Sequence, residues 1–239
     1  MFSEGTEAMR NLLGGKGAGS AEMIRAGMPV PPGFTITTEA CLEYFSISGN
    51  LPAELREKLS DELDRGNLGT FPRELADQIQ DALSKQTGDF PSGMSDQIQA
   101  AMRLIEKQTG KRFGDQDNPL LVSVRSGARV SMPGMMDTVL NLGLNTVTLQ
   151  GLIKLTADER FGWDSYRRFI QGYGSIVLGV NSELFEEIIS SHKQSLNKKE
   201  DTDLTASDWQ MVVAEFKALV LREAGQHFPD KPEVQLDGA

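Results

Sequence analysis

A five-residue run, LLVSV at residues 120–124, is the sequence feature that most constrains the fold. The run is apolar, rich in valine and too short for a stable helix, so it predicts a buried strand. FTIT at residues 34–37 alternates apolar and hydroxyl residues and predicts a second, half-buried strand. Most other segments space their apolar residues as helices do, and we therefore expect an α+β fold that is helix-rich with a small sheet.

Helices are predicted before and after the LLVSV strand. Residues 17–27 predict a short helix closed by Gly27, and Thr38 is expected to cap a helix that runs from Glu39 to about Phe45. Between this helix and the strand lie three similar segments: LPAELREKLSDEL from residue 51, FPRELADQIQDAL from 71 and FPSGMSDQIQAAM from 90. We interpret them as three short helices made by local duplication, and chance similarity among amphipathic helices is the alternative.

The second half of the chain predicts longer helices. Ser182 is expected to begin one of them, and Thr205 with Asp208 forms a predicted capping box before the last. Gly172 and Gly174 are expected to weaken the helix around Trp163 by about 1 kcal/mol each. The final residues, FPDKPEVQLDGA, are expected to hold no stable element. Apolar residues share one face of each of two helices: Tyr166, Phe169, Ile170 and Tyr173, then Trp209, Val212, Val213, Phe216, Leu219 and Val220.

Composition excludes several classes of protein. The formal net charge of −10 argues against general binding to nucleic acid or to an anionic membrane. Cys41 is the single cysteine, which excludes an internal disulfide and a cysteine-based zinc site and fits a reducing compartment. Since the chain has no long apolar run and its N-terminus, MFSEGTEAMR, does not read as a signal peptide, we expect a soluble, cytoplasmic protein.

The stretch GGKGAGS at residues 14–20 is the first candidate site. Gly14, Gly15 and Gly17 surround Lys16 directly before the first predicted helix. Backbone N–H groups, the helix N-terminus and the ammonium group would together attract a phosphate group. The stretch is not a Walker A loop because Gly17 follows the lysine, and an ordinary flexible turn is the alternative.

The second candidate is SVRSGARVSMPGMMDT at residues 123–138. Arg125 directly follows the LLVSV strand, a place from which a guanidinium group can bind phosphate oxygens. The glycines and Pro133 would give the following loop a specific bend, and its methionines an adaptable apolar surface. The alternative is that the methionines fill a gap in the core while the arginines face solvent.

Other chemistry has little support in the sequence. His192 and His227 stand apart from any cysteine or acidic constellation, and we interpret both as surface or helix-end residues. Asp201 and Asp203 are expected to form a solvated approach to a helix. No Ser-His-Asp elbow, HExxH motif or carboxylate-rich metal loop occurs in the sequence.

Four segments together resemble the beginning of the pyruvate, phosphate dikinase family: MRNLLGGKGAGSAEM, PVPPGFTITTEAC, PLLVSVRSGARVSMPGMMDTVLNLGL and FGWDSYRRFIQGYG. The resemblance implies an incomplete ATP-grasp-like nucleotide-binding domain. Its first subdomain would span residues 1–145, with inserted helical repeats at 46–96, and a truncated helical subdomain would span 146–239. The family reaction transfers phosphoryl groups from ATP through a phosphohistidine, to phosphate and to pyruvate.

The resemblance also assigns roles to residues. Lys16 and Arg125 match residues that hold the ATP phosphates, and Gly14, Gly15 and Gly17 belong to the glycine-rich loop. Magnesium ligands, the phosphohistidine and the pyruvate site would lie outside this chain, and family members form homodimers. A loop that covers the nucleotide would comprise Ser131, Met132, Pro133, Gly134, Met135, Met136, Asp137 and Thr138.

Three functional readings remain at this point. The first is the N-terminal ATP-binding portion of a dikinase, inactive by itself, and it is the one that the motifs favour. The second is a free-standing nucleotide-binding or regulatory module, which a well-packed C-terminus would support. The third, a complete small kinase, requires a second lobe with metal-binding carboxylates that the sequence does not show.

Overall fold

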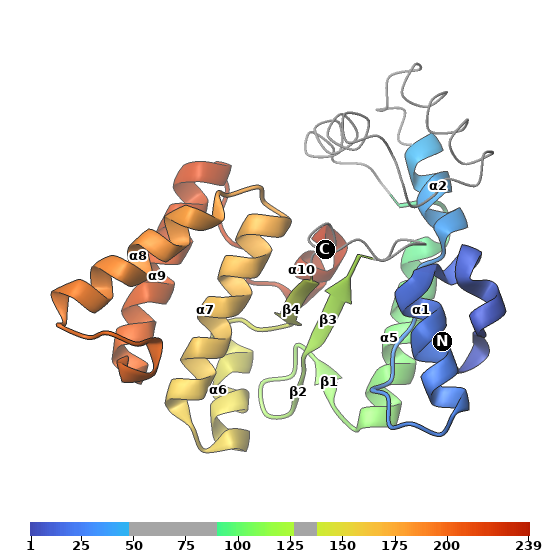
Figure 1. Cartoon of the computed structure of the whole chain (residues 1–239), viewed down its shortest axis with the longest axis horizontal. Helices are drawn as coiled ribbons and strands as arrows, with labels where there is room; N and C mark the ends of the chain where they lie inside the picture. Colours follow the sequence, from blue (N-terminus) through green and yellow to red (C-terminus); the bar gives the residue numbers. More distant parts are fainter. Residues whose placement is uncertain (48–89, 127–137) are drawn as a thin grey trace. The chain divides into compact units, whose positions relative to one another are not determined.

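The computed structural model describes residues 1–47, 90–126 and 138–239 of the chain (Figure 1). Contacts divide these residues into two compact units. Unit 1 comprises the described residues of Met1–Thr109 together with Ser126, and unit 2 comprises Gly110–Arg125 and residues 138–239. The predicted subdomain boundary between residues 145 and 146 stays a prediction.

Unit 1 is helical in its described residues. Two 3₁₀ turns, η1 (Phe2–Glu4) and η2 (Glu7–Met9), lead into α1 (Arg10–Arg25), and α2 (Thr38–Ile47) and α5 (Met94–Thr109) follow. The predicted stop at Gly27 is confirmed: this residue has φ +76°, and the amide of Met28 returns to the carbonyl of Met23. The helix before it is longer than predicted and begins at Arg10.

The segment between α1 and α2 corrects two predictions. FTIT at residues 34–37 forms no strand, because no strand in the described part of the chain pairs with it. Thr37 rather than Thr38 caps α2, since its Oγ1 accepts a hydrogen bond from the amide of Ala40. Thr38 instead donates its hydroxyl to the carbonyl of Asn11, which ties α2 to α1.

Only the last of the three repeated segments falls in the described residues. Its helix is α5, whose first turn begins at Met94, three residues after Pro91. The copies that start at residues 51 and 71 lie outside the described residues, so the proposed duplication stays a prediction.

The described strands of unit 2 form two separate two-stranded sheets, so the expected helix-rich fold with little strand is found but the strands do not join in one sheet. LLVSV divides into the end of β2 (Pro119–Leu120) and most of β3 (Val122–Arg125). β1 (Arg112–Phe113) pairs in parallel with β2, and β3 pairs antiparallel with β4 (Thr138–Leu142). Leu120 is buried, whereas β3 alternates half-buried and exposed residues, so this strand covers the core with one face only.

The core of unit 2 is helical. α7 (Glu159–Ile176) packs against α9 (Ala206–Ala224), α6 (Thr146–Thr156) packs on α7, and α8 (Ser182–Ser195) lies beside α9 (Figure 1). Both predicted apolar faces and the start of α8 at Ser182 are confirmed. The capping box of Thr205 and Asp208 is also confirmed.

The prediction for the end of the chain is wrong. Residues Pro232–Gly238 form α10, and Gln235 within it is completely buried. Its side-chain amide accepts a hydrogen bond from the amide of Gly143 at 2.9 Å and donates to the carbonyls of Leu144 and Pro229 at 2.9 and 2.8 Å. These contacts hold α10 beside β4, and Gly143 lies 92 positions from Gln235, too far for a sequence pattern to reveal.

Candidate functional site

Gly14 divides α1 within the glycine-rich stretch. Its φ of 69° and ψ of 171° are not helical, and they lie in a region that an L side chain rarely adopts. A new helical segment therefore starts at Gly15, and Lys16 lies in its first turn. The first N–H groups of a helix have no partner within that helix, so they are available to an anion. The sequence predicts a glycine-rich loop around Lys16 before a helix over residues 17–27, and in the structure only Gly14 of this stretch leaves helical geometry.

Gly17 fits closely against another part of unit 1. A Cβ atom at this position would lie 2.7 Å from Oγ1 of Thr35 and 3.2 Å from Cβ of Leu13. Any larger residue would push the segment around Thr35 away from α1. The sequence offers no signal for this contact, because it joins residues that are 18 positions apart.

Lys16 makes a contact that the sequence does not reveal. Its ammonium group donates a hydrogen bond of 3.1 Å to the carbonyl of Ser126, within unit 1. Ser126 directly follows Arg125 in the chain. The lysine is half-buried and its carbonyl partner is neutral. Among the described residues no carboxylate forms an ion pair with it.

Arg125 is the last residue of β3 in unit 2, and its side chain is exposed. Thr138, the first residue of β4, is its cross-strand partner. Thr138 therefore belongs to a strand rather than to the loop in which the resemblance places it. The other residues of that predicted loop lie outside the described residues: Ser131, Met132, Pro133, Gly134, Met135, Met136 and Asp137.

Asp201 and His192 in unit 2 have side-chain partners, whereas His227 is exposed. Asp201 accepts from Lys193 at 2.8 Å and from the buried Arg167 at 3.2 Å, so it is paired rather than simply solvated as the sequence suggests. His192 lies in the last turn of α8 with Nε2 2.8 Å from Oε1 of Glu215, and His227 is exposed. Within the described ranges, no three His, Cys, Asp or Glu side chains gather as a metal site would require.

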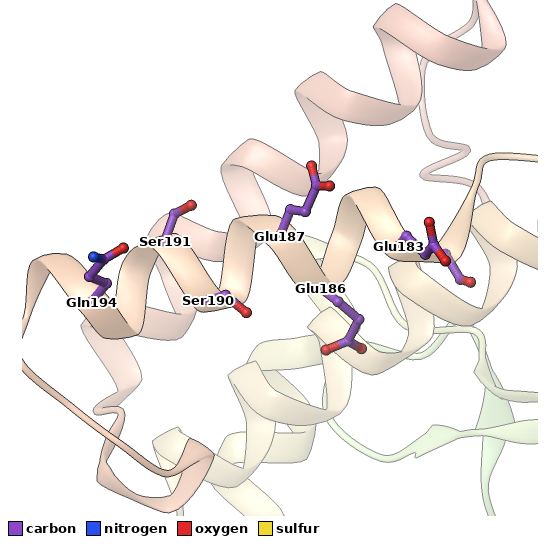
Figure 2. Close-up of a pocket in the computed structure, with 7 residues that line it drawn as sticks. Glu183, Glu186, Glu187, Ser190, Ser191 and Gln194 are labelled. Carbon is purple, nitrogen blue, oxygen red and sulfur yellow. The ribbon is translucent and has the colours of Figure 1, made fainter.

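A shallow hollow on the outer face of α8 is a poor candidate for an anion. Figure 2 shows its polar side chains along one helix. Three glutamates among them repel a phosphate group, and the others offer no positive charge. The lining residues are Ser182, Glu183, Glu186, Glu187, Ser190, Ser191 and Gln194.

Comparison with known proteins shows the family to which the chain belongs. Residues 10–230 match the family described as pyruvate phosphate dikinase, AMP/ATP-binding domain. This chain belongs to that family. The match includes Lys16, Arg125 and the helices of unit 2 as far as the turn before α10.

Individual relatives agree along almost the whole chain. It is 46% identical over 240 residues to pyruvate, phosphate dikinase of Clostridium symbiosum, and 44% identical over 237 residues to that of Rhizobium meliloti. A chloroplastic pyruvate, phosphate dikinase of Mesembryanthemum crystallinum is 43% identical over 234 residues. These alignments cover 98–100% of this chain but only 20–23% of the relatives, so the chain spans about a fifth of their length.

The sequence also predicts where the protein is located. Among the described helices none is long and apolar enough to cross a membrane. Relatives include chloroplastic proteins, so the cytoplasmic location stays a prediction.

Proposed function

We propose that this chain binds ATP as the N-terminal nucleotide-binding portion of a pyruvate, phosphate dikinase. The observation that carries the proposal is the helical segment that begins at Gly15, with Lys16 in its first turn, in a chain that matches an AMP/ATP-binding domain. A helix N-terminus and an ammonium group, which in Lys16 meets no carboxylate in the described part of the chain, are groups that attract a phosphate.

Lys16 and Arg125 are the residues that we propose to hold the ATP phosphates. Phosphoryl transfer depends mainly on positioning the phosphates and on neutralising charge that develops in the transition state. Arg125 can bind two phosphate oxygens at once through its planar guanidinium group, whereas Lys16 acts as a point charge. The glycines at 14, 15 and 17 let the backbone of α1 approach the ligand, and the segment of residues 131–137, before β4, is proposed to cover the nucleotide.

The complete reaction is proposed for the longer protein of which this chain is one part. There, ATP, pyruvate and phosphate give AMP, phosphoenolpyruvate and diphosphate through a phosphohistidine outside this chain. The resemblance implies that the Mg²⁺ ligands, which are oxygen atoms, lie outside this chain, and we derive no step from them. An ATP-grasp-like fold and a homodimer of the full-length protein are parts of the same proposal.

Calorimetric titration with ATP and magnesium tests the binding role. Replacing Lys16 or Arg125 by alanine removes a charge-assisted contact worth about 1.5–3 kcal/mol, so we expect about 10- to 150-fold weaker binding. The matched controls are Lys107→Ala and Arg222→Ala, which remove exposed cations elsewhere and should change the Kd less than twofold. Equal Kd values for all four variants would contradict the assignment.

The alternative is a free-standing nucleotide-binding or regulatory module. The sequence predicts a C-terminal tail without a stable element, which would count against this alternative. The tail instead forms α10 with Gln235 buried, so that argument does not apply. A chimera separates the two readings: this chain replaces the 240 matching residues of the Clostridium symbiosum relative. We expect the chimera to form phosphoenolpyruvate and the isolated chain to hydrolyse no ATP. ATP binding by the chain without activity of the chimera favours the module.

A further inference from the structure

Asn141 has a backbone conformation that is unusual for its place in the fold. Its φ is +62°, and only two other non-glycine residues in the described ranges have positive φ, Ala157 and Asn197. Both of those end helices, where a left-handed residue satisfies the last carbonyls. Asn141 instead lies within β4, where extended geometry is the rule.

The pairing of β4 with β3 explains the conformation. Val122 pairs with Leu142, and Val124 pairs with Val139. Two steps along β3 therefore correspond to three along β4, which is a β-bulge at Leu140 and Asn141.

The bulge changes which side chains of β4 face the core. In a regular strand, residues three apart point to opposite faces. Here Val139 and Leu142 are both buried, at 3% and 0% exposure, and Leu140 between them is 49% exposed. One extra residue thus allows both Val139 and Leu142 to enter the core.

The same change decides what lies beside Arg125. If the pairing continued from Val122 and Leu142 along both strands without a bulge, Val139 would lie opposite Arg125. With the bulge, Thr138 is opposite Arg125, and directly opposed residues share a face of the sheet with Cβ atoms about 5 Å apart. The exposed arginine therefore has a hydroxyl group as its neighbour instead of a valine.

We propose that Asn141 is a positioning residue, whose left-handed conformation holds the bulge that places Thr138 beside Arg125, and that this pair binds one phosphate group of the nucleotide. The second part rests on the proposed function. The Thr138 hydroxyl donates to a phosphate oxygen that the guanidinium group also contacts, while Asn141 acts through the register of β4 and does not touch the ligand.

Substitutions at Asn141 test the positioning role. Glycine accepts positive φ without strain, whereas β-branched valine does so very rarely, so Asn141→Gly should keep the ATP Kd within about twofold and Asn141→Val should raise it about tenfold or more. Asn197→Val is the matched control, since Asn197 has φ +54° and lies after α8. We expect it to lower the melting temperature as Asn141→Val does, with no change in Kd. Equal weakening by both valine variants would overturn the proposal.

Thr138 supplies the second test. Thr138→Val keeps the shape and removes the hydroxyl, and we expect ATP binding to weaken about five- to tenfold, while Thr138→Ser keeps the wild-type Kd. Equal Kd values for Thr138→Val and the wild type would overturn the role of the hydroxyl.

An NMR measurement separates this inference from the proposed function. Cross-strand NOEs between Arg125 and Thr138 should be present in the wild type and in Asn141→Gly, and absent in Asn141→Val. If the wild type binds no ATP, the proposed function fails while loss of these NOEs in Asn141→Val still supports the register role. NOEs retained in Asn141→Val overturn that role whatever the affinity for ATP.

Discussion

Replacing Gln235 by alanine is expected to lower the free energy of unfolding of unit 2 by about 3 kcal/mol, within a range of about 2–4. The side chain makes three hydrogen bonds to backbone groups, each contributing about 1 kcal/mol net. Alanine also leaves the amide of Gly143 and the carbonyl of Leu144 without this partner in a buried place, which makes the loss larger than for an exposed glutamine.

The assay is urea unfolding followed by tryptophan fluorescence. Both tryptophans of the chain, Trp163 and Trp209, lie in unit 2, so the signal reports the unit that contains Gln235. With a slope of about 2 kcal/mol per M of urea, a loss of 3 kcal/mol moves the midpoint by about 1.5 M. Gln210→Ala in α9 is the control, because this glutamine is exposed. A midpoint shift below about 0.3 M for Gln235→Ala would refute the reasoning.

Gln235→Glu adds a pH test of the same contacts. One carboxyl oxygen can still accept from Gly143, but the other faces the two carbonyls that the amide group of glutamine contacts. Only the protonated acid can donate to a carbonyl, so the folded state raises the pKa of this glutamate above its unfolded value of about 4.3. The stability of the variant relative to wild type should therefore fall as the pH rises above about 4, and a pH-independent difference would contradict the account.

Two other predictions concern unit 2. A Cβ on Gly174 would lie 2.7 Å from Cζ of the buried Phe185, so Gly174→Ala should destabilise the fold by about 1–3 kcal/mol. A Cβ on Gly172 would meet nothing within 4 Å, so Gly172→Ala should stabilise the helix by up to about 1 kcal/mol. Equal effects of the two substitutions in urea unfolding would contradict this packing. Hydrogen bonds from Lys198 and the amide of Thr205 lower the pKa of Asp208 to about 2. Its carboxylate therefore stabilises the fold above about pH 4, and this contribution is lost as the pH falls toward 2. Asp208→Asn should cost about 2 kcal/mol at pH 7 and much less near pH 2, and an equal loss at both pH values would exclude this cause.

The candidate site could be predicted only in part. The glycine-rich stretch marks Lys16, and the end of the LLVSV strand marks Arg125, because both signals depend on neighbours in the chain. The contact of Gly17 with Thr35 and the pairing of Thr138 with Arg125 have no such signal. The first depends on the path of a distant segment and the second on a bulge, and a one-residue change of register exchanges the faces of a strand.

The sequence by itself determined the apolar faces of α7 and α9, the start of α8, the capping box before α9 and the family of the chain. The apolar faces of α7 and α9 and the capping box at Thr205 depend on residues within one or two helical turns of each other, so spacing predicts them. Only the tertiary structure decided that FTIT forms no strand, that Gly174 serves helix packing and that α10 forms at all. Each of these outcomes depends on which segments folding brings together: FTIT has no pairing strand among the described residues, whereas Gln235 meets Gly143 across 92 positions.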